Sequence, residues 1–67
     1  MKNQIITEDE QYISYLIQEN DSFKKYAIVS KMEDLVEISC KDKTTNQIYS
    51  VYLRKIDIKN LYDTLRG

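Results

Sequence analysis

Hydrophobic and polar positions alternate most regularly in the second half of the chain. In residues 35–41, apolar Val36, Ile38 and Cys40 alternate with polar residues. In residues 47–55, Tyr49, Val51 and Leu53 share one face and Ile48, Ser50 and Tyr52 the other, and the residues between the two segments are polar. A period of two is typical of β-strands, and a polar connection of this length is typical of a hairpin turn. The pattern therefore predicts a β-hairpin over residues 35–53.

Two earlier segments extend this prediction. Residues 25–30 form a third strand-like run, which a mostly polar turn joins to the hairpin. Residues 11–19 admit two interpretations: the run Tyr-Ile-Ser-Tyr-Leu-Ile is rich in residues that favour strands, whereas Thr7 and Glu10 fit a capping box ahead of a helical stripe. We favour a strand and keep a helix as the alternative.

The C-terminal segment has a helical period. Ile58, Leu61, Tyr62 and Leu65 follow the spacing i, i+3, i+4 and i+7, which places them on one face of a helix. Asp57 precedes them and is a favourable N-cap residue. The sequence therefore predicts an amphipathic helix over residues 58–66.

Together these elements indicate one α+β domain spanning residues 1–67. The expected fold is an antiparallel β-meander of three to four strands with the C-terminal amphipathic helix packed on one face. An α-β-β-β-α order is the alternative if residues 11–19 are helical. Residues 1–10 are expected to form a flexible or polar N-terminal segment, because they are polar apart from Met1, Ile5 and Ile6.

Composition argues against catalysis, a metal and a cofactor. The chain has no histidine, no glycine before Gly67 and one cysteine. A catalytic triad, a zinc site and a phosphate-binding loop each depend on residues that are missing here. The cluster Glu8-Asp9-Glu10 lacks the spacing of a calcium loop. Cys40 shares strand parity with Val36 and Ile38, so we interpret it as a core residue rather than a nucleophile.

Size and cysteine content suggest how the domain is stabilised and where it works. A 67-residue chain buries a small core, and such domains are usually reinforced by disulfides, a metal or a second copy. With disulfides and zinc set aside, self-association remains, and we expect a homodimer. A lone cysteine, the absence of a signal-like segment and the short apolar runs predict a cytoplasmic protein that does not associate with a membrane.

One helix covers one face of a sheet, so the other face should be open. The residues with the parity of the covered face are Ile13, Tyr15, Ile17, Val36, Ile38, Tyr49, Val51 and Leu53. The apolar residues left for the open face, and therefore the predicted partner-binding residues, are Tyr12, Leu16, Leu35, Ile48 and Tyr52. Exposed apolar patches of this kind are typical of interaction sites.

Two functional hypotheses follow. In the first, the open face binds another protein, and the molecule is a small non-enzymatic regulator or inhibitor; its richness in Ile, Lys, Asn and Tyr suits a phage or mobile element that acts on a host protein. In the alternative, the sheet binds single-stranded nucleic acid by stacking and phosphate contacts. The contacts would come from Lys41, Lys43, Tyr49, Tyr52, Arg54 and Lys55. A pI near 5.3 favours the first hypothesis.

Overall fold

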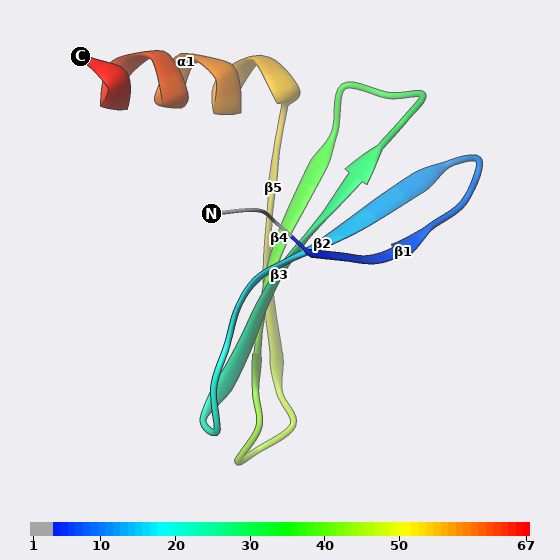
Figure 1. Cartoon of the computed structure of the whole chain (residues 1–67), viewed down its shortest axis with the longest axis vertical. Helices are drawn as coiled ribbons and strands as arrows, with labels where there is room; N and C mark the ends of the chain where they lie inside the picture. Colours follow the sequence, from blue (N-terminus) through cyan, green and yellow to red (C-terminus); the bar gives the residue numbers. More distant parts are fainter. Residues whose placement is uncertain (1–3) are drawn as a thin grey trace.

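The computed structural model describes residues 4–67, which form a five-stranded antiparallel sheet followed by one helix (Figure 1). Each strand is hydrogen-bonded to its neighbours in the chain, so the sheet is a simple meander in the order β1-β2-β3-β4-β5. The elements are β1 (Gln4–Glu8), β2 (Tyr12–Glu19), β3 (Phe23–Ser30), β4 (Val36–Asp42), β5 (Ile48–Leu53) and α1 (Lys55–Arg66).

The predicted α+β class, the antiparallel meander and the C-terminal helix are confirmed, but the strand count is five rather than three to four. The additional strand is β1, which lies in the N-terminal segment to which the sequence assigns no element. Residues 12–19 form β2, so the α-β-β-β-α alternative is wrong. Residues 12–19 form a strand rather than a helix because β2 pairs with both β1 and β3, so its backbone N–H and C=O groups find hydrogen-bond partners along both edges.

Side chains close the hairpins in place of glycine. Asp9 accepts hydrogen bonds from the backbone N–H groups of Gln11 and Tyr12, at 2.8 and 2.7 Å, between β1 and β2. Asn20 and Asp42 act in the same way in the next tight turns. Asn46 adopts a positive φ of 62°, a conformation that asparagine tolerates better than most residues. These short polar side chains therefore supply the turn geometry that glycine usually provides.

Register places two different surfaces on the sheet. Tyr15, Ala27, Ile38 and Val51 lie opposite one another on successive strands, and we call their surface the helix-side face because the first turn of α1 adjoins it. The opposite surface, on which Leu16, Tyr26, Ser39 and Ser50 lie in register, is the far face. The sequence parity predicts this division correctly.

The core is very small. Among residues 4–67, Ala27 and Val36 are the only buried apolar residues, and both belong to the helix-side face. Cys40 is half-buried rather than a core residue, since its position opposite Tyr49 lies away from the covered centre of the sheet. A two-layer domain of this size would normally bury more than this.

The helix begins at Lys55, three residues before the predicted start. Asp57 is therefore the third helical residue rather than the cap, and its carboxylate accepts a hydrogen bond from the backbone N–H of Arg54 at 3.3 Å. The hydrogen bond from the Arg54 side chain, together with this backbone bond, lowers the pKa of Asp57. The side-chain hydrogen bond and the negative charge of Asp57 raise the pKa of Arg54. The start of α1 is thus fixed by a local ion pair at 3.0 Å.

The expected packing of the helix on one sheet face is limited to its first turn. Lys55 and Ile58 line a hollow together with sheet residues, whereas Leu61, Tyr62 and Leu65 are 56, 58 and 76% exposed. Figure 1 shows α1 running away from the strands, with its C-terminal end far from β5. Beyond Ile58, the apolar side of α1 therefore remains largely exposed among residues 4–67.

Candidate functional site

The far face holds all five predicted partner-binding residues, although not as one cluster. Tyr12, Leu35 and Tyr52 line a hollow of about 400 Å³ together with Ile28, Ser30 and Glu37; we call it the tyrosine hollow. Leu16 lies half-buried opposite Tyr26 and lines neither this hollow nor the one that contains Ile48. The structure thus brings three of the five residues together and separates the other two.

Hydroxyl groups and one carboxylate occupy the centre of the far face. Ser39 is 1% exposed, and its hydroxyl donates a hydrogen bond to Glu37 Oε2 at 2.9 Å. Ser50 Oγ lies 2.9 Å from Ser39 Oγ and 3.4 Å from the same carboxylate oxygen. Glu37 also lines the tyrosine hollow. One acceptor is thereby held in a fixed position at the margin of an apolar depression.

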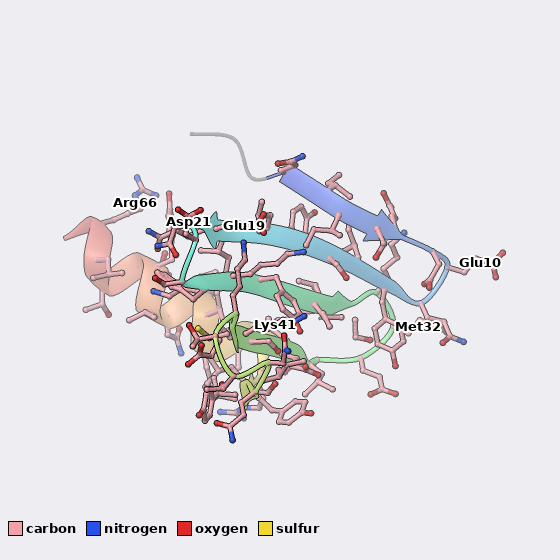
Figure 2. All side chains as sticks on the ribbon, turned by 90° about the horizontal axis from the view of Figure 1, so that it is seen from below. Glu10, Glu19, Asp21, Met32, Lys41 and Arg66 are labelled. Atoms are coloured by element: carbon pink, nitrogen blue, oxygen red, sulfur yellow. The ribbon has the colours of Figure 1, made fainter. Side chains whose placement is uncertain are left out.

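A second hollow, of about 300 Å³, lies on the same face, and we call it the lysine hollow. It is lined by Ile6, Ser14, Lys24, Tyr26, Lys41 and Ile48. Lys24 and Lys41 are directly opposite each other on β3 and β4, so two like charges face the same depression. The Lys41 side chain is labelled in Figure 2. Like charges in cross-strand positions repel each other, and an anionic group placed between them would relieve that repulsion.

The residues of the nucleic-acid alternative do not form one surface. Tyr49 is opposite Cys40 on the helix-side face, whereas Tyr52 is opposite Glu37 on the far face. Lys43 and Arg54 are already paired, with Glu19 at 2.8 Å and with Asp57 at 3.0 Å respectively. The hydrogen bond from Lys43 lowers the pKa of Glu19. Lys55 lines the hollow on the helix side, and only Lys41 and Tyr52 remain on the far face.

Sequence reasoning missed Lys24, Tyr26 and Glu37 as members of the far face. Their parity was available, because Tyr26 and Lys24 alternate with Ala27 and Lys25 along β3. The missing information was the pairing between strands, which includes a bulge between Leu16 and Gln18 that sets Gln18 opposite Lys25 and Glu19 opposite Lys24. A bulge of this kind leaves little signal in a single sequence.

No cluster of three or more Asp, Glu or Cys side chains suited to a metal ion occurs within the described part of the chain. Over the same residues, the structure contains no helix with the length and hydropathy needed to cross a membrane. Comparisons with protein-family models, with curated proteins and with solved structures give no match for this chain.

Proposed function

We propose that this protein is a small, non-enzymatic binding module that recognises another protein through its far face. The observation that carries the proposal is the tyrosine hollow, in which Tyr12, Leu35 and Tyr52 surround an apolar depression beside the fixed carboxylate of Glu37. Protein interfaces combine large aromatic side chains with a few well-placed polar groups. The far face has this composition.

Tyrosine suits such a surface because it contributes a large apolar area at a small cost in side-chain entropy. Tyr12 and Tyr52 are 46 and 62% exposed, so each has apolar surface left to bury against a partner. Glu37 would accept a hydrogen bond from a donor on the partner, since the two serines hold its carboxylate in place. An apolar side chain flanked by a hydrogen-bond donor is therefore the partner feature that fits.

At the level of the cell, the proposal is that the module is a cytoplasmic regulator or inhibitor, of the kind that phages and mobile elements direct against a host protein. The composition that suggests this origin is the high content of Ile, Lys, Asn and Tyr, which make up 27 of 67 residues. The mode of action would be steric, with the far face covering a surface that the host protein needs.

The test is a comparison of two tyrosines on the same strand. Tyr49 and Tyr52 have nearly equal exposure, 60 and 62%, but point to opposite faces. In a pull-down from host lysate, a specific partner should be retained by the wild type and by Tyr49→Ser and lost with Tyr52→Ser. Retention by Tyr52→Ser together with loss in Tyr49→Ser would show that the far face is not the binding surface.

The lysine hollow supports a second candidate function, the binding of single-stranded nucleic acid. Lys24 and Lys41 would contact a phosphate while the half-buried Tyr26, which lines the same hollow, contacts a base. Titration of a fluorescent single-stranded oligonucleotide at two salt concentrations separates the two functions. Binding that weakens steeply with salt and is abolished by Lys24→Glu would support this candidate, whereas the protein-binding proposal expects no such binding.

A further inference from the structure

The helix-side face and the apolar side of α1 meet at Ile58, and among residues 4–67 apolar side chains of both remain exposed, including Val51, Leu61 and Leu65. At this junction is a recess of about 390 Å³, which we call the corner recess because it lies where α1 meets the sheet. Its lining consists of Tyr15, Ile17, Ala27, Val29, Val36, Ile38, Lys55 and Ile58. Seven of these eight residues are uncharged and mainly apolar, which distinguishes the recess from both hollows of the far face.

The helix of the same chain is held away from the helix-side face. One residue, Arg54, separates the end of β5 from the start of α1, so there is no linker. The backbone N–H of Lys55 donates a hydrogen bond to Asp34 Oδ1 at 2.7 Å, which ties the first residue of α1 to the turn between β3 and β4. The ion pair of Arg54 with Asp57 fixes the next residues. These contacts set the direction of α1, and Leu61, Tyr62 and Leu65 consequently remain exposed.

The molecule has more surface than a compact chain of its mass. Its accessible surface is 5516 Å², whereas a compact monomer of 8.0 kDa exposes roughly 4,450 Å². The excess of about 1,070 Å² is close to the area that each partner contributes to a stable dimer, roughly 600–1,000 Å². The radius of gyration agrees, because it is 12.8 Å against roughly 11 Å for a compact domain of this length.

We infer that a second copy of this chain covers the helix-side face, with α1 of each copy lying against the corner recess and the neighbouring strands of the other. Ile58 in the first turn of α1 forms part of the recess wall, so an apolar side chain of the helix is already in place beside the sheet, and Leu61 and Leu65 further along α1 are aliphatic like Ile58. A two-fold axis makes this contact twice, so each copy supplies both the helix and its acceptor.

Charge is compatible with this arrangement. The net charge of one chain is −1, so two copies repel each other only weakly. Lys59 and Asp63 lie on α1 and pair with each other at 3.0 Å, so these two charges balance each other within the helix. The inference assigns the homodimer to the face opposite the proposed partner-binding surface, and it does not depend on what the far face binds.

The test uses two exposed apolar residues that differ in position. Leu65 is 76% exposed on α1, and Met32 is 79% exposed in the turn between β3 and β4. Leu65→Glu and Met32→Glu therefore remove similar side chains and add the same charge. In sedimentation velocity across a dilution series, the wild type and Met32→Glu should have twice the 8.0 kDa mass of one chain. Leu65→Glu should raise the dissociation constant on the order of 100-fold.

The inference would be overturned if the wild type sediments with the mass of one chain at a concentration about 100 times the dissociation constant of a typical stable dimer. Equal dimerisation of the two variants would also overturn it. A second measurement locates the interface without any substitution. In a mixture of isotope-labelled and unlabelled chains, filtered NOE spectra should connect the Leu61 and Leu65 methyl groups with Val51 and Ile38 of the other copy. A dimer that lacks these NOEs would place the interface elsewhere and would also overturn the inference.

Discussion

The two faces of the sheet differ in composition although they share the same five strands. The helix-side face has an almost uninterrupted apolar centre, with Ala27 and Val36 as its buried residues. The far face has a polar centre, where Ser39 and Glu37 are hydrogen-bonded, and two hollows on either side of it. Permanent interfaces are more apolar than transient ones. The difference is what we would expect if the dimer that we infer forms through the helix side and the partner that we propose binds the far side.

A small domain gains from separating these roles. Apolar area stabilises a dimer at all times, and no conformational change is needed to expose it. A mixed surface can be left in water without aggregating and can still bind a partner that supplies matching groups. The meander makes the separation simple, because alternate residues of every strand point to opposite faces.

The largest effect is expected from shortening the buried side chain of the helix-side face. Val36→Ala removes two methyl groups from a residue that is 4% exposed, so it should lower the free energy of unfolding by about 2 kcal/mol. Urea denaturation followed by circular dichroism measures this change. Ile48→Ala, at a 55% exposed position of the far face, is the control and should have a much smaller effect. Equal losses of unfolding free energy in the two variants would show that the two faces do not differ in how much they stabilise the fold.

The polar centre of the far face should contribute less. Ser39→Ala removes a buried hydroxyl that bonds Glu37, and it should cost about 1 kcal/mol of unfolding free energy. Ser50→Ala is the matched control, because Ser50 is exposed and makes a longer 3.4 Å contact with the same carboxylate. The same denaturation experiment compares the two variants. A larger loss of unfolding free energy for Ser50→Ala would contradict the expectation that the Ser39 hydroxyl contributes more than the Ser50 hydroxyl.

Replacing a far-face tyrosine should leave stability and dimerisation nearly unchanged. Tyr52→Ser alters a residue that is 62% exposed, so the free energy of unfolding should change by less than about 0.5 kcal/mol. Sedimentation velocity should still give the mass of the dimer. Dissociation into single chains would mean that the far face, rather than the helix side, holds the two copies together.

The smallest effect concerns acid. The pKa of Asp57 is lowered below its ordinary value of 3.8 by bonds from Arg54, so the folded chain binds fewer protons there than the unfolded chain. Its contribution to stability is complete above pH 3.8 and is lost as the pH falls through the lower, folded value. Helical ellipticity should therefore decline in that range. Asp57→Asn should show lower ellipticity at neutral pH and a weaker decline, and an unchanged titration would contradict this assignment.

Much of this architecture is predictable from sequence because it depends on local rules. Alternation in β4 and β5 and parity across the sheet correctly predict which residues share a face. Asp57, by contrast, is equally suited to the cap and to the third position of a helix. In the structure the helix begins earlier, where the local Arg54–Asp57 pair is accompanied by a hydrogen bond from Lys55 to Asp34, a contact between residues 21 positions apart that no local pattern contains.

The binding surfaces were less predictable for a similar reason. Tyr12, Leu35 and Tyr52 meet in one hollow only because β3 separates β2 from β4 and the register aligns them. Strand β1 was missed because Gln4–Glu8 has no regular alternation, and its pairing with β2 contains a bulge. The helix period predicts an apolar side for α1, but it does not say whether that side faces its own sheet or another chain.

The turns closed by Asp9, Asn20 and Asp42 also affect the unfolded state. Because Gly67 is the only glycine, the unfolded backbone samples fewer conformations than that of a chain with glycine in its hairpins. Each such replacement reduces the entropy lost on folding by the equivalent of about 0.4–1 kcal/mol, provided that the residue fits its turn. A domain in which residues 4–67 include two buried apolar side chains is thus stabilised partly by limiting the disorder of its denatured ensemble.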